Sequence, residues 1–223
     1  EGDTLMWMDN AGDVREAHTF SPPDDLYDFS VSAGRAGSFF AAVGYGYRYE
    51  NSIPSDTYAE LVLFDADGAM LPELLDILDV CAATGLALAS GHIHVSETKK
   101  VFAEAKKRGV ERLIFTHPED IVGASMEDTL EIADMGAQVE HSLAFFVEGS
   151  KFRNRSNEEL KAYIDLVGPE RTILCSDLGQ VGTLTPLQGF RKAVETCLDL
   201  GYTEAQIKPM VSANAAQVIG LDG

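Results

Sequence analysis

The chain has 223 residues, of which 45% are hydrophobic and 24% are charged, so it is expected to fold as one large domain or two small ones and not to be disordered. Its formal net charge is −19, and an acidic surface repels a phosphate backbone, which excludes nucleic acid as an expected partner. No apolar stretch approaches the roughly 18 residues of a membrane-spanning helix, so no membrane association is expected.

Residues 1–58 follow no regular pattern. The segment DTLMWMDN (3–10) has the composition of a strand, whereas residues 21–56 are rich in glycine, serine, proline and aromatic side chains. A stretch of this length without helical or strand periodicity is typical of a functional loop, so we predict an irregular excursion that serves as a lid or as an oligomer contact.

From residue 59 onward, short apolar runs alternate with segments of helical periodicity. The predicted strands are residues 60–67, 86–90, 112–117, 137–142 and 172–177. The predicted helices are residues 71–85, 96–109, 125–136, 157–168, 186–201 and 203–220. The last helix opens with a capping box formed by Thr203 and Gln206. Strands separated by helices of this length predict a parallel sheet covered by helices.

Three cysteines, Cys81, Cys175 and Cys197, lie far apart within apolar runs. An odd number of cysteines without metal-ligand spacing is typical of buried free thiols in a reducing compartment. We therefore expect a cytoplasmic protein, and we interpret Cys175 as a core residue and not as a ligand.

Polar residues recur where four of the predicted strands end. They are His92 and His94, then His117, then Glu140 and His141, and finally Asp177. His117 follows His92 by 25 residues and His141 follows His117 by 24, which is about one strand plus one helix. The carboxyl ends of parallel strands meet at one edge of a sheet, where active sites of α/β proteins are built. Imidazole and carboxylate are ligands of zinc and similar divalent ions, so the pattern predicts a metal site.

These residues also have structural explanations. Thr116 could cap a helix that starts at Pro118, which would place His117 in a turn; Asp177 could cap the segment after its strand; and His94 could be an exposed turn residue. Four of the five histidines nevertheless lie at three of these strand ends, which favours a metal site.

Strand alternation further sorts the candidates. His92 and His94 are two residues apart, so their side chains would point to the same side of an extended segment. Glu140 and His141 are adjacent, so only one of them can face the site from a regular strand.

These motifs resemble the amidohydrolase superfamily, the metal-dependent TIM-barrel hydrolases. They are GH at 91–92, THPE at 116–119, EH at 140–141, SDLGQ at 176–180 and SANAAQVIGLD at 212–222. The likeness covers about residues 60–222. It is greatest to small, poorly characterised amidohydrolase-like members and more distant to phosphotriesterase-type enzymes. In the last motif the family's usual Asn-Pro-Ala is replaced, because Asn214 is followed by Ala215.

The resemblance implies an α/β fold of the (β/α)8 TIM-barrel type. It makes His92 and His117 metal ligands at the ends of strands five and six, and Asp177 a ligand and general base at strand eight. His141, with Glu140, His94 and Gln180 as further candidates, would contact substrate or surround the ligands. The implied cofactor is one or two divalent ions, with zinc expected first and manganese or iron as alternatives.

One feature of the superfamily is missing from the chain. The family's first strand carries an HxH pair, and no such strand precedes residue 59. We therefore expect residues 59–223 to be the C-terminal part of a barrel, in which the chain supplies strands four to eight, with residues 3–10 as strand four and residues 60–67 as an accessory piece. The other strands would come from a preceding segment or from a second chain, since a part-barrel leaves an open sheet edge.

The activity that the resemblance implies is hydrolysis of an amide, cyclic amide, lactone or ester bond in a small-molecule substrate. A decarboxylase or other C–C lyase of the same superfamily is one alternative. A non-catalytic accessory subunit, which binds a partner through residues 1–58 and the aromatic run FFAAVGYGYRY (39–49), is another. A homo-oligomer is expected.

Overall fold

The computed structural model describes residues 4–8, 14–19, 30–33, 39–42, 63–65, 67–120 and 122–221. The chain divides into two compact units, Glu1–Ala69 and Met70–Gly223, and each is described by itself. No helix within the described ranges is long and apolar enough to cross a membrane.

The first unit contains two antiparallel strand pairs. β1 (Thr4–Met8) pairs with β2 (Val14–Thr19), and β3 (Ser30–Ala33) pairs with β4 (Phe39–Ala42). The strand predicted at residues 3–10 is therefore present, but it belongs to a two-stranded sheet, and its assignment as barrel strand four is not confirmed. Most other residues of the predicted excursion, including 43–49 of the aromatic run, lie outside the described residues, and the predicted strand at 60–67 is described only in part, with a single bridge at Phe64.

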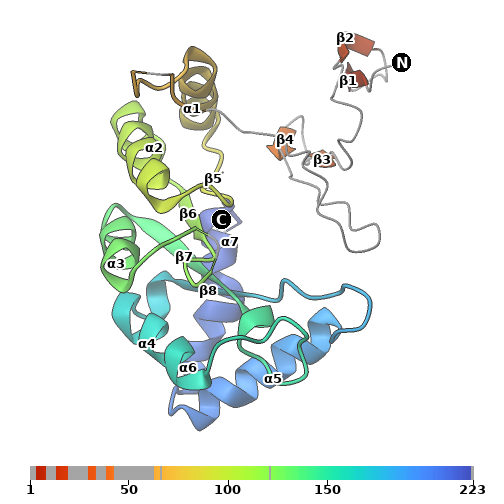
Figure 1. The fold of residues 1–223 in the computed structure, drawn as a ribbon, viewed down its shortest axis with the longest axis vertical. Helices are drawn as coiled ribbons and strands as arrows, with labels where there is room; N and C mark the ends of the chain where they lie inside the picture. The colour runs from red at the N-terminus through yellow and green to blue at the C-terminus, as the bar shows by residue number, and fades with distance from the viewer. Residues whose placement is uncertain are drawn as a thin grey trace. The chain divides into compact units, whose positions relative to one another are not determined.

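The second unit alternates strands and helices as the sequence predicts (Figure 1). Its parallel strands are β5 (Leu88–Ala89), β6 (Leu113–Thr116), β7 (Ala137–Ser142) and β8 (Thr172–Cys175), which lie side by side in that order. Its helices are α1 (Pro72–Thr84), α2 (Val95–Arg108), α3 (Met126–Asp134), α4 (Asn157–Val167), α5 (Pro186–Asp199), α6 (Glu204–Lys208) and α7 (Asn214–Val218), with a π-helical turn at Pro209–Ala213. The predicted parallel α/β arrangement is confirmed for four strands.

Short polar sequences define the helix ends. Ser125, Ser156 and Thr185 begin α3, α4 and α5 with capping boxes, and Gln206 accepts a hydrogen bond from the Thr203 backbone N–H at the start of α6. Gly109 ends α2 with a φ of 90°, a conformation that only glycine adopts readily. The alternative in which Thr116 caps a helix is wrong, because residues 118–120 form a turn and α3 begins at Met126.

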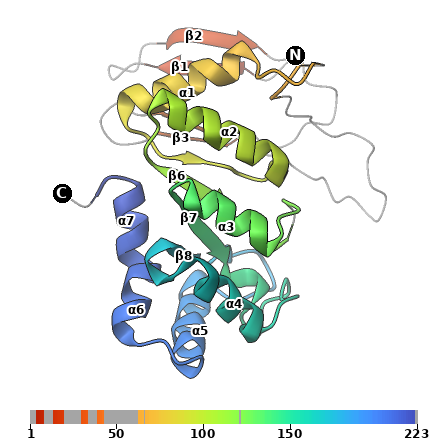
Figure 2. The same ribbon diagram turned by 90° about the vertical axis from the view of Figure 1, so that its left-hand side faces the viewer.

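The two faces of the parallel sheet differ in burial. Helices α2, α3 and α4 follow one another along one side of the strands, as both views of the ribbon show (Figures 1 and 2). Leu113, Phe115 and Val139 are completely buried, and Leu174 nearly so. Alternate positions of the same strands, such as Ile114 and Glu140, are only partly buried and line a cavity of about 440 Å³ with residues of α7 and the π-helical turn. We call this second side the open face of the sheet.

Asp128 ties the start of α3 to α2, and this contact predicts a pH-dependent stability. The hydrogen bond from Lys99 Nζ at 2.6 Å, together with those from Ser125, holds the pKa of Asp128 well below its ordinary range. Because the folded-state pKa is lowered, the contribution is complete above the unfolded pKa of about 3.9 and is lost as the pH falls through the folded-state value. Asp128→Asn should lower the free energy of unfolding by about 0.5–1 kcal/mol at pH 7.

The check is urea denaturation of both proteins between pH 7 and pH 3. The difference between their free energies of unfolding should shrink below about pH 4, where the Asp128 carboxylate of the wild type begins to lose its stabilising contribution. An unchanged difference over the whole range would show that charge does not stabilise this helix start.

Candidate metal centre

His117 and Asp177 have backbone conformations that are unusual for residues other than glycine. Their φ angles are 49° and 46°, and no other non-glycine residue among those described has a positive φ. His117 directly follows β6, and Asp177 lies two residues after β8. The left-handed conformation costs a non-glycine residue roughly 1–2 kcal/mol, and such strain is concentrated at functional sites. The strain therefore marks these two strand ends as a candidate site.

The site brings together the three metal ligands that the resemblance implies. His117 is 8% exposed, and its Nε2 lies 3.8 Å from Asp177 Oδ2. The ring of His92 is centred 5.5 Å from the ring of His117. Ser142 Oγ, at the end of β7, donates a hydrogen bond of 2.9 Å to Asp177 Oδ2 and so orients the carboxylate.

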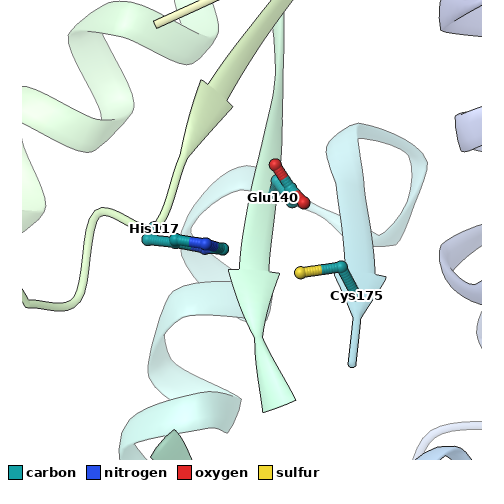
Figure 3. A group of neighbouring side chains, drawn as sticks. All are labelled: His117, Glu140 and Cys175. Carbon is teal, nitrogen blue, oxygen red and sulfur yellow. The ribbon is translucent and has the colours of Figure 1, made fainter. Parts of the chain in front are cut away.

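A second set of donor atoms overlaps with this one at His117. Ligand atoms of His117, Glu140 and Cys175 all lie within 4.8 Å of one another and could hold a metal ion. Figure 3 shows the Cys175 sulfur pointing toward the His117 ring, with the Glu140 carboxylate beside both. The three side chains come from the ends of β6, β7 and β8. Cys175, which the sequence suggests is a core residue, is half-buried and lies within this group of donor atoms.

Glu140 and His141 point to opposite faces of β7, as their adjacent positions require. Glu140 faces the open side, whereas His141 is fully buried under the helices, where its Nδ1 is hydrogen-bonded to Glu119 Oε1 and its ring lies 5.4 Å from Tyr163. The contact with substrate that the resemblance implies for His141 does not agree with this burial. Glu119 received no site role from the sequence, although its position two residues after His117 could have drawn attention to it.

His94 and Gln180 shape the loops next to the site. His94 is exposed and is the N-cap of α2, where its Nδ1 accepts a hydrogen bond from the Ser96 N–H at 3.2 Å. Gly91 has a φ of 56° and residues 91–93 form a turn, so the extended segment in which His92 and His94 would point the same way is not formed here. Gln180 Nε2 donates to the Asp177 carbonyl at 3.3 Å, which braces the loop after β8.

The electrostatic environment differs between the donor groups. Burial lowers the pKa of His92, and the neighbouring His117 adds to this effect, so the imidazole is neutral near pH 7 and its lone pair is available. Burial raises the pKa of the Cys175 thiol, and the charge of Glu140 and a hydrogen bond to that residue raise it further. Cys175 therefore carries its proton at neutral pH unless a cation is bound beside it.

The donor set fits a divalent cation. His117 Nδ1 is buried and has no hydrogen-bond partner within the part of the chain that the structure describes. A buried polar atom without a partner is costly, and a ligand is one way to satisfy it. Imidazole, carboxylate and thiol groups together are the ligand types of zinc.

The chain was compared with family models, curated proteins and solved structures. A model described as a family of unknown function (DUF6282) matches residues 33–140, and no curated protein matches the chain in sequence. A phosphotriesterase homology protein from Escherichia coli, solved with phosphate in its active site, is 16% identical with a TM-score of 0.51, over 70% of this chain and 57% of that one. The part of the chain that aligns therefore shares its fold with this phosphotriesterase homology protein.

Two further solved structures are similar to the chain with lower TM-scores. An amidohydrolase from Burkholderia multivorans with bound zinc is 14% identical with a TM-score of 0.49, over 70% of this chain and 58% of that one. N-acetyl-D-glucosamine-6-phosphate deacetylase from Mycobacterium smegmatis is 20% identical with a TM-score of 0.43, over 66% of this chain and 42% of that one. The chain thus spans less than three-fifths of the length of each of these structures.

Proposed function

We propose that the chain forms the C-terminal part of a metal-dependent hydrolase of the amidohydrolase type. Its substrate would be a small molecule with an amide, cyclic amide, lactone or ester bond. The observation that carries the proposal is the approach of His117 Nε2 to Asp177 Oδ2, 3.8 Å apart, from two strained residues at the carboxyl ends of parallel strands.

The residues that would hold the cation are His92, His117 and Asp177, with Glu140 next to them. Zinc is the expected ion, manganese and iron are the alternatives, and one or two ions are possible in this donor set. A divalent cation here would lower the pKa of water toward neutrality and polarise the carbonyl or phosphoryl oxygen of the substrate.

Asp177 is the proposed general base. Its side chain is 42% exposed, so a substrate and a water molecule can reach it. Oδ2 is held by Ser142, and the carboxylate retains free lone pairs that can accept a proton from the attacking water and return it to the leaving group.

The remaining barrel strands are part of the proposal. A preceding segment or a second chain would cover the open face of the sheet, whose positions Ile114, Glu140 and Cys175 line the cavity described above. A homo-oligomer and a cytoplasmic location stay predictions.

Metal analysis of the native protein, purified without chelator and without added metal, tests the proposal. We expect one to two equivalents of zinc, manganese or iron. His117→Gly should lower the affinity by more than about 100-fold, because loss of outer-sphere partners alone costs 10–100-fold. Glycine suits this position, because it adopts a φ of 49° without strain.

His94→Ser is the matched control. It removes a histidine from the neighbouring loop and replaces one N-capping side chain by another, so its metal content should equal that of the wild type. A wild-type protein that contains no metal and takes none up on dialysis would overturn the hydrolase proposal and favour an accessory subunit. A loaded protein that decarboxylates substrates and hydrolyses none would favour the lyase alternative.

A further inference from the structure

We propose that Cys175 is itself a ligand of this metal centre and binds as a thiolate, so that the site selects zinc and other thiophilic divalent ions over magnesium and manganese. The inference rests on the proposed function, because it concerns the same centre. It adds a sulfur donor to the histidines and aspartate that the sequence motifs identify.

The position of Cys175 distinguishes it from the other two cysteines. Cys81 lies in α1 and Cys197 in α5, and both are buried, Cys197 within the apolar core formed with residues such as Leu160 and Ile164. Cys175 is the last residue of β8 and is only half-buried. Its sulfur lies within 4.8 Å of ligand atoms of both His117 and Glu140, and it points toward the histidine ring (Figure 3).

Two further observations point to a ligand among these three side chains. His117 is more than nine-tenths buried, yet its Nδ1 has no hydrogen-bond partner within the described ranges. Glu140 and Cys175 also line the cavity of about 440 Å³ on the open face, so an ion can reach both donors. A purely structural cysteine would gain more from an apolar setting such as that of Cys197 than from a place between an imidazole and a carboxylate.

A sulfur ligand changes which ions the centre accepts. Thiolates favour zinc and cobalt, whereas magnesium and manganese prefer carboxylate, carbonyl and water oxygens. When the cation binds, the thiol S–H bond is exchanged for a sulfur–metal bond and the proton leaves to solvent. No oxidation or reduction takes place.

Titration of the metal-free full-length protein with Co²⁺, followed by absorption spectroscopy, tests the inference. Cobalt bound to a thiolate gives an intense near-ultraviolet charge-transfer band in addition to its visible d–d bands. We expect both in the wild type. Cys175→Ser should abolish the charge-transfer band while the d–d bands persist, and should weaken zinc binding by at least about tenfold.

The double variant Cys81→Ala/Cys197→Ala is the matched control, since it removes the other two thiols and should retain the charge-transfer band. Circular dichroism verifies that each variant is folded. Cobalt d–d bands in the wild type without a charge-transfer band, or a charge-transfer band that survives in Cys175→Ser, would overturn the role of Cys175 and leave the proposed function intact. No cobalt binding at all would overturn both.

Discussion

Replacement of Asp177 by asparagine is expected to reduce turnover by about 10²–10⁴-fold, the contribution of a general base, while part of the metal remains bound. The variant is well suited to the backbone, because asparagine is one of the few residues that tolerate a positive φ. Its amide oxygen can still accept the hydrogen bond from Ser142 and can still ligate weakly. The amide cannot take up a proton, so the reduction in turnover should appear as a lower kcat.

The measurement combines steady-state kinetics, on the substrate found by screening amides and lactones, with metal analysis of the same samples. Asp199→Asn, an equivalent change at an exposed carboxylate on α5, is the control and should behave as the wild type. Unchanged turnover in Asp177→Asn would refute its assignment as base. Loss of turnover together with all of the metal would instead show that Asp177 acts mainly as a ligand.

Replacement of His141 by leucine is expected to destabilise the fold by about 3–5 kcal/mol, the usual cost of removing one member of a buried polar pair. Both side chains are completely buried, and Glu119 Oε1 is hydrogen-bonded to His141. The other carboxylate oxygen, Oε2, has no partner among the residues that the structure describes. The leucine variant would therefore leave a buried carboxylate without its hydrogen bond.

A double-mutant cycle measured by urea denaturation separates this pair from simple packing. Replacing both residues, as in His141→Leu/Glu119→Leu, should recover much of the lost stability, because an apolar pair carries no desolvation cost. A double variant that loses the sum of the two single effects would show that His141 and Glu119 are not coupled. Metal content should remain measurable in the single variant, since His141 faces away from the donor group.

The order of helices and strands in residues 70–221 was predictable because local sequence and tertiary packing agree there. Glycines such as Gly85 and Gly109 end helices in the left-handed conformation, and apolar runs between them form the strands. His92, His117 and His141 are each separated by about one strand plus one helix, and Asp177 follows at the end of the next strand. The meeting of His92, His117 and Asp177 at the strand ends therefore follows from the parallel topology.

The composition of the donor group was less predictable. Whether Glu140 or His141 faces the open side depends on which face the helices cover, and the strand pattern alone does not decide it. Cys175 resembles a core residue because it ends an apolar run, and only its approach to His117 and Glu140 in the structure places it in a group of donor atoms that could hold a metal ion. The positive φ angles of His117 and Asp177 also break the strand alternation on which parity arguments depend.

The N-terminal unit shows a different limit of prediction from the sequence. β1 was recognisable as a strand from its own residues, but its pairing with β2 was not, because a strand's partner is set by contacts that its own sequence does not encode. The assignment of β1 to the barrel came from the family resemblance, and the antiparallel pair does not support it.

The opposite directions of Glu140 and His141 make the length of the turn before β7 critical for chemistry as well as for folding. α3 ends at Asp134 and β7 begins at Ala137, with Gly136 between them at a φ of 98°. An insertion or deletion there that shifts β7 by one residue would exchange the two faces of the strand, burying the carboxylate under the helices and presenting the imidazole on the open face. Evolution and protein engineering can thus vary the side chains around this turn far more freely than its length.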